Sequence, residues 1–144
     1  MLTQLAIGSA LILATIVVSG LTWWGLEAIL VRVHPWASRP PHGPKLAAVL
    51  TLSLICTLMM MTVSVWVWAI ALYWLEIFIN FEASMYFALV AFTTLGFGDI
   101  LLPQEWRLLS GLSAANGLLI FGMLTAMLVE ALRNTRSRQR DGRT

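Results

Sequence analysis

Three long apolar segments constrain the fold of this chain more than any other feature. They cover residues 5–31, 46–75 and 106–132. About 20 apolar residues in a helix cross the roughly 30 Å hydrocarbon core of a bilayer, so each segment is long enough to span it. With 59% hydrophobic and 11% charged residues, the chain is also too apolar for an ordinary water-soluble domain. The sequence therefore predicts an all-α integral membrane protein with three transmembrane helices.

The basic residues indicate how these helices are oriented. Of the nine Lys and Arg residues, three lie in the first loop and five in the C-terminal tail. Short segments rich in Lys and Arg stay on the cytoplasmic side of a membrane. We therefore expect a multi-pass protein of the cell (inner) membrane, with the N-terminus outside and the C-terminus in the cytoplasm. The positive charge is expected to contact anionic lipid headgroups and requires no nucleic acid partner.

Prolines divide the chain into two membrane modules, because four of the five prolines lie in one short stretch and proline interrupts helices. The expected parts are a first transmembrane helix, a Pro-rich cytoplasmic linker, a second membrane module and a basic cytoplasmic tail, at residues 1–33, 34–45, 46–132 and 133–144. In the first helix, Ala6, Ala10 and Ala14 recur at every fourth position. Such a pattern lets another helix approach closely within a membrane.

A short apolar segment and an irregular sequence after it interrupt the second module. Residues 83–93 are too few to cross a bilayer, so we expect a re-entrant helix that enters the membrane and returns on the same side. It leads into Thr93-Thr94-Leu95-Gly96-Phe97-Gly98-Asp99. Irregular backbone is tolerated at membrane depth only where protein surrounds it or where it lines a water-filled path. This run is therefore predicted to line a polar path.

The two glycines indicate what this run offers to a solute. Glycine adopts positive φ at little cost, so Gly96 and Gly98 can turn successive carbonyl groups to one side of an extended strand. Such carbonyl groups can replace the hydration shell of a monovalent cation. The expected ligands are the Thr94 hydroxyl, innermost, and the carbonyl groups of Thr94, Leu95, Gly96 and Phe97. One chain cannot enclose such an axis, so four copies are expected.

The run Thr94-Leu95-Gly96-Phe97-Gly98-Asp99 resembles the filter signature of potassium channels, Thr-Val-Gly-Tyr/Phe-Gly-Asp. Tyr86-Phe87 resembles the aromatic pair of the pore helix in that family, and Trp106-Arg107 falls where its inner helix begins. The segment from Gly117 to Gly122 resembles its glycine hinge. The similarity covers roughly residues 46–132, so the first helix is additional to the pore domain of the family.

The resemblance implies a homotetramer with K⁺ ions in a filter near the outer mouth, an outer helix in the second span and an inner helix in the third. The K⁺-binding residues that it implies are Thr94, Leu95, Gly96, Phe97 and Gly98. The filter-supporting residues that it implies are Thr93, Tyr86 and Asp99. Because Val90 stands where some family members carry a carboxylate, Asp99 needs another partner, and Tyr86 is the expected donor.

Four residues of the third span carry further expectations. Gly117 and Gly122 are candidate gating hinges, or else they only permit close helix contacts. Asn116 and Glu130 are candidates for lining the pore. Asn116 faces either the cavity or another helix, and Glu130 either attracts cations or pairs with Arg133.

Four acidic residues fall on the predicted outer side of the membrane. Four copies of each give a negative mouth that concentrates cations, unless they are only solvated loop carboxylates. These residues are Glu76, Glu82, Asp99 and Glu105.

Other functions remain open from the sequence. A cation channel that discriminates weakly between K⁺ and Na⁺ is one alternative, and a non-conducting accessory membrane subunit is another. Gly96-Phe97-Gly98-Asp99 also resembles the Gly-x-Gly-Asp motif of intramembrane aspartyl proteases. These enzymes need two carboxyl groups, and the only other aspartate is Asp141 in the tail. No enzymatic activity is expected, nor a voltage sensor or ligand-binding domain.

Overall fold

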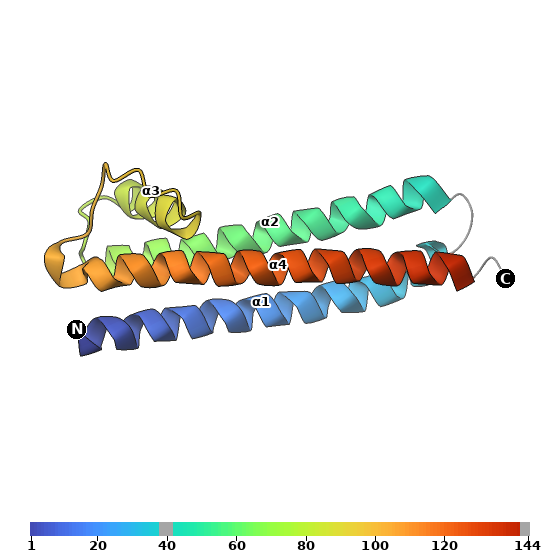
Figure 1. The fold of residues 1–144 in the computed structure, drawn as a ribbon, viewed down its shortest axis with the longest axis horizontal. Helices are drawn as coiled ribbons and strands as arrows, with labels where there is room; N and C mark the ends of the chain where they lie inside the picture. Colours follow the sequence, from blue (N-terminus) through green and yellow to red (C-terminus); the bar gives the residue numbers. More distant parts are fainter. Residues whose placement is uncertain (38–41, 142–144) are drawn as a thin grey trace.

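The structure is a computed structural model that describes residues 1–37 and 42–141 (Figure 1). Its elements, in chain order, are α1 (Leu2–Ala37), α2 (His42–Trp74), α3 (Phe81–Phe92), the 3-10 helix η1 (Gln104–Trp106) and α4 (Arg107–Asp141). The described residues contain no β-strand. The predicted all-α fold is therefore confirmed.

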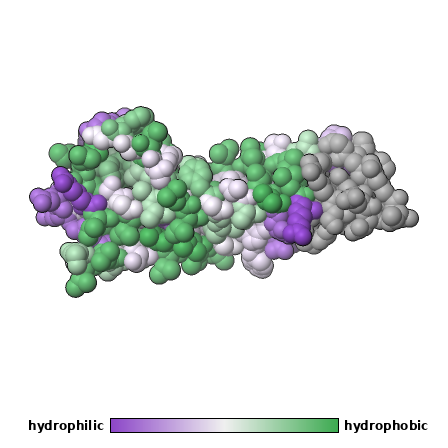
Figure 2. Space-filling model, in the orientation of Figure 1, coloured by the Kyte–Doolittle hydropathy of each residue, from purple (hydrophilic) through white to green (hydrophobic). Residues whose placement is uncertain are grey.

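Three of these helices are long and apolar enough to cross a membrane, by length and composition. The spans are Leu2–Ile29, Ala47–Trp74 and Gln104–Glu130, which agree with the predicted segments to within a few residues. Among the coloured residues of Figure 2, apolar side chains cover most of the face shown, and hydrophilic residues gather at the left end and beside the residues drawn in grey. Such a surface suits a helical bundle surrounded by lipid, with its ends in the interfacial regions.

Helices extend into the predicted linker from both sides. α1 and α2 take up both ends of residues 34–45. Pro44 lies in the first turn of α2, where its missing N–H leaves no helical hydrogen bond unmade. Residues 38–41 of the linker and residues 142–144 of the basic tail lie outside the described residues.

The path of the chain places its short helix at one end of the bundle. α1 and α4 run in the same direction and α2 runs in the opposite one (Figure 1). α3 folds back beside the end of α2, and the chain then returns to begin α4 at that same end. This is the re-entrant path that the short apolar segment predicted. The N-terminus lies at the end that holds α3, and α4 finishes at the other end.

The main core lies between α2, α3 and α4, in the half of the molecule that holds α3. The largest fully buried apolar side chains are Trp68 and Leu72 from α2, Phe92 from α3, and Leu109 and Ile120 from α4. Close packing of these side chains holds α3 against the two long helices. The extended run that follows Phe92 therefore begins at a residue whose side chain is fully buried in the core.

α1 packs on both α2 and α4, but not through its alanines. Its buried positions are separated by four or seven residues, which is about one or two helical turns. These positions are Gln4, Gly8, Thr15, Ser19 and Leu26. Ala6, Ala10 and Ala14 are exposed. The alanine pattern therefore does not mark the face of α1 that packs within the chain.

Candidate functional site

α3 ends in a tight turn that leads the chain into the glycine-containing run. The Thr93 amide donates to the Leu89 carbonyl at 3.0 Å, and the Leu95 amide donates to the Val90 carbonyl at 3.0 Å. The Thr93 hydroxyl also donates to the Leu89 carbonyl, at 2.8 Å. The last carbonyl groups of α3 thus find partners at the start of the run. Thr93 therefore joins this run to the helix end.

The backbone of this run alternates between two conformations. φ is +57° at Thr94, +57° at Gly96 and +77° at Gly98, whereas Leu95 and Phe97 do not have positive φ. When positive and negative φ alternate along a chain, each peptide group is rotated relative to the one before it. Successive carbonyl groups then point to the same side. The positive φ values expected for the two glycines are present. Thr94 adopts the same conformation without being a glycine.

Residues 94–99 are exposed on the single chain. The side chains of Leu95 and Phe97 are 58% and 66% exposed. Backbone carbonyl groups at membrane depth need partners from protein, water or ions, and exposed apolar side chains beside them need a protein or lipid neighbour. The carbonyl groups and apolar side chains of residues 94–99 are therefore open to protein, water, ions or lipid.

Asp99 holds the C-terminal end of this run through two hydrogen bonds. The Tyr86 phenol of α3 donates to Asp99 Oδ2 at 2.5 Å, and the Ile100 amide donates to Asp99 Oδ1 at 3.0 Å. The hydrogen bond from the Tyr86 phenol is the main reason that the pKa of Asp99 lies below its ordinary value, and the Ile100 amide acts in the same direction. The structure thus brings together Tyr86 and Asp99, as expected.

Replacing Tyr86 with phenylalanine is expected to raise the pKa of Asp99, because it removes the largest cause of the lowering. A carboxyl whose folded-state pKa is lowered contributes stability above its unfolded-state pKa, and this contribution is lost as the pH falls through the folded-state pKa. In Tyr86→Phe this contribution is therefore smaller, and its loss on acidification is complete at a higher pH than in the wild type. A ¹³C NMR titration of the Asp99 carboxyl measures the midpoint in the wild type, in Tyr86→Phe and in the control Tyr73→Phe. Equal midpoints in all three proteins would contradict control by the phenol.

One face of α4 is open along most of its length. Its exposed residues recur every three or four positions, as expected for one side of a helix. They are Gly111, Ala115, Leu118, Gly122, Thr125 and Val129. Glu130 lies beside this open face, far from α3, and is also exposed. The Thr125 hydroxyl donates to the Phe121 carbonyl of its own helix at 2.8 Å.

Asn116 does not belong to the open face of α4. Its side chain is fully buried against α1, where Nδ2 donates to the Thr15 hydroxyl oxygen at 2.9 Å. The expectation that Asn116 lines a pore is therefore wrong, and its alternative, a contact with another helix, is correct. The physical reason is that an amide in an apolar bundle needs a hydrogen-bonding partner, which α1 supplies.

The Asn116 and Thr15 side chains are expected to couple α1 to α4 energetically. In a double-mutant cycle of Asn116→Leu and Thr15→Val, we expect a coupling free energy of about 0.6–1.7 kcal/mol, the range of polar contacts between membrane helices. Unfolding by denaturing detergent measures it. Thr62→Val is the control, since the Thr62 hydroxyl is exposed and donates only within α2, to the Leu58 carbonyl at 2.9 Å. A coupling near zero would contradict a direct bond.

The two candidate hinge glycines have different surroundings. A Cβ on Gly117 would overlap the carbonyl group of Phe92, so the missing side chain lets α4 touch the end of α3. In the described part of the chain, nothing lies within 4 Å of the place that a Cβ on Gly122 would take. Close packing therefore accounts for Gly117. A hinge at either glycine stays a prediction.

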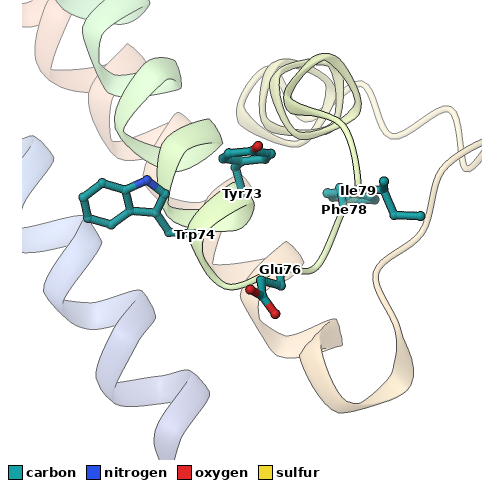
Figure 3. Close-up of a pocket in the computed structure, with 5 residues that line it drawn as sticks. All are labelled: Tyr73, Trp74, Glu76, Phe78 and Ile79. Atoms are coloured by element: carbon teal, nitrogen blue, oxygen red, sulfur yellow. The ribbon is translucent and has the colours of Figure 1, made fainter.

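Carboxylates gather at the end of the molecule that holds α3. Glu76, Glu82, Asp99 and Glu105 are all exposed there. Glu76 also lines a hollow at the C-terminal end of α2, shown in Figure 3, together with Tyr73, Trp74, Phe78 and Ile79. Carboxylates that share one end of a protein attract cations to it.

Comparison with known families agrees with this geometry. A family model described as "Ion channel" matches residues 46–134, which is more than half of the chain. The chain belongs to this ion channel family. The matched part of the channel covers α3, most of α2 and most of α4, and leaves α1 outside. Neither the curated proteins nor the solved structures contain a match to the chain.

The channel brings most of the predicted site residues together around the C-terminal end of α3, whereas Glu130 lies near the other end of α4. Sequence reasoning missed Gln4, Thr15 and Ser19 on the buried face of α1. A signal for them exists, because polar residues in an apolar span mark the side that is hidden from lipid. Their spacing by nearly whole helical turns puts them on one face.

Proposed function

We propose that this ion channel is a homotetrameric, K⁺-selective channel whose filter consists of residues 94–98 from four chains. The observation that carries the proposal is the alternating φ at Thr94, Gly96 and Gly98, which turns the carbonyl groups to one side. Around a fourfold axis, such strands form successive rings of carbonyl oxygens. Each ring replaces part of the hydration shell of a K⁺ ion, and the Thr94 hydroxyls form the innermost ring.

The position of α3 supports this proposal. The C-terminal end of a helix carries partial negative charge. α3 ends against Gly117, well inside the membrane-spanning part of α4. A cation is costly at that depth, so four helix ends directed there lower the free energy of an ion below the filter.

Assembly of four chains also covers what one chain leaves exposed. Leu95 and Phe97 then pack against neighbouring protein, and the open face of α4 lines the path below the filter. Glu130 beside that face gives a ring of carboxylates that attracts cations. Gly122 on the same face, where no described residue lies within 4 Å of the place of a Cβ, is the proposed bending point.

The proposed orientation places the filter end outside the cell. The carboxylates at that end then form a negative outer mouth. Arg133 is exposed at the other end of α4, and the basic tail that begins with it lies at the cytoplasmic surface, where it contacts anionic lipid. The side chains of residues 134–144 lie outside the part that the structure describes.

Flux measurements in liposomes test the proposed function. The purified channel is reconstituted, its mass in the membrane-mimetic state is determined, and flux is followed under opposed K⁺ and Na⁺ gradients. We expect a particle of four chains with K⁺-selective flux that Ba²⁺ blocks. Equal K⁺ and Na⁺ flux would instead support a weakly selective cation channel. A tetramer without flux would contradict the proposal and support an accessory subunit.

A further inference from the structure

We propose that Gln4 of α1 is a positioning residue for the outer end of the pore; this inference rests on the proposed function. Gln4 is polar, lies at the start of an apolar helix and is only 8% exposed. Its Nε2 donates to the Glu105 carbonyl in η1, and its Oε1 accepts the Leu108 amide of α4 at 3.2 Å. We call this pair of hydrogen bonds the Gln4 clasp.

The clasp satisfies backbone groups that α4 cannot satisfy by itself. α4 begins at Arg107, so the Leu108 amide is among the first four N–H groups of the helix, which have no carbonyl partner within it. The Gln4 side chain accepts from this amide and at the same time donates to the preceding turn. Leucine has a similar shape but neither polar group, so packing alone does not account for a buried glutamine here.

The clasp lies at one end of the segment that joins the filter to α4. At the filter end of this segment, the Tyr86 phenol holds Asp99 to α3 at 2.5 Å. At the other end, Gln4 holds Glu105 and Leu108 to α1. Between these points Leu102 is buried in the core. The segment that joins the filter to α4 is thus held at both ends. α3 holds one end, and α1, which lies outside the matched residues 46–134, holds the other.

Two further contacts join α1 to α4. Farther along both helices, the Thr15 and Asn116 side chains form their buried hydrogen bond, and Gly8 lies against the Leu112 side chain. α1 therefore contacts α4 at three levels, with the clasp nearest the filter. Loss of the clasp frees the segment between the filter and α4 from α1. The contacts at Gly8 and Thr15 still hold α1 against α4.

Three substitutions in the full-length channel test this proposal. Gln4→Leu removes both hydrogen bonds, and Gln4→Glu keeps the acceptor but loses the donor when ionised. Gln104→Leu is the matched control, because Gln104 is an exposed amide in η1. Each protein is reconstituted in liposomes for K⁺ and Na⁺ permeability, and hydrogen exchange is followed at the Leu108 amide.

We expect Gln4→Leu to speed exchange at Leu108 by about tenfold, the effect of losing one hydrogen bond, and to lower the ratio of K⁺ to Na⁺ permeability. Gln4→Glu should fall between wild type and Gln4→Leu, and Gln104→Leu should match wild type. A merely structural role would give this order in the exchange rates but would leave the ratio of K⁺ to Na⁺ permeability unchanged.

Two results would overturn the inference. Unchanged exchange at Leu108 in Gln4→Leu would show that the clasp does not hold α4. Faster exchange with an unchanged permeability ratio would show that the clasp does not position the mouth of the pore. Absence of flux from the wild-type channel would count against the proposed function alone, because exchange reports the clasp without any conduction.

Discussion

Replacing Gly98 with alanine is expected to abolish K⁺-selective flux. Gly98 has φ of +77°, in a region that costs a residue with a side chain about 1–2 kcal/mol. In the proposed tetramer, four copies around one axis raise this cost to roughly 4–8 kcal/mol. The chain can avoid it by turning the peptide group, which moves a carbonyl oxygen away from the ion path and breaks a ring of ligands. We expect flux from Gly98→Ala liposomes to fall to that of empty vesicles.

Gly20→Ala is the matched control for this substitution. Gly20 lies in α1, is exposed, and has nothing within 4 Å of the place of a Cβ in the described part of the chain. Alanine in a helix is favoured over glycine by roughly 0.5–1 kcal/mol, so insertion, assembly and flux should match wild type. Wild-type flux and selectivity in Gly98→Ala would be incompatible with a filter built from this strand.

Gly117→Ala is expected to separate α3 from α4. The new Cβ would overlap the Phe92 carbonyl group and lie 3.0 Å from Phe92 Cα. The Phe92 backbone has little freedom to move away, because its side chain is fully buried in the core. Overpacking of this kind costs typically about 1–3 kcal/mol. We expect each subunit to lose stability by this amount, measured by unfolding in detergent.

The same substitution should also reduce flux. α3 leads directly into Thr93 and the proposed filter. In the proposed tetramer, a displaced helix end moves the innermost carbonyl groups out of register with those of neighbouring chains. We expect K⁺ flux to fall at least about tenfold, since the filter must hold its ligands in place.

Two other glycines of α4 provide the controls. Gly111 and Gly122 have no neighbour within 4 Å of a Cβ position among the described residues. Gly111→Ala should preserve stability, and Gly20→Ala in α1, away from the open face of α4, is the control for flux. If Gly117→Ala behaves in the same way, α3 and α4 do not touch there. If Gly122→Ala preserves stability but changes flux, Gly122 acts as the hinge.

Hydropathy and backbone chemistry predicted the main features of the fold. The three spans follow from about 20 consecutive apolar residues each, which is a local property. α3 follows from an apolar run too short to cross the membrane. The positive φ values at Gly96 and Gly98 follow from the freedom of glycine itself. The family match at residues 46–134 agrees with the predicted extent of the second module.

Contacts between distant helices were not predictable in this way. Membrane helices are apolar on all sides, so hydropathy does not show which face meets another helix. Asn116 was therefore equally compatible with a cavity and with a helix contact, and Thr15 of α1 decided between them. Ala6, Ala10 and Ala14 pointed to a face of α1 that is exposed in the structure.

The sequence by itself determined three membrane-spanning helices, a re-entrant helix and a strand with its glycines at positive φ. Only the tertiary structure decided which face of α4 is open, why Gly117 has no side chain, and that Gln4 holds the start of α4. The physical reason is one of range. Hydropathy and the conformational freedom of the backbone depend on residues adjacent in the sequence. Packing and hydrogen bonding join residues that are distant in the sequence and meet only when the helices assemble.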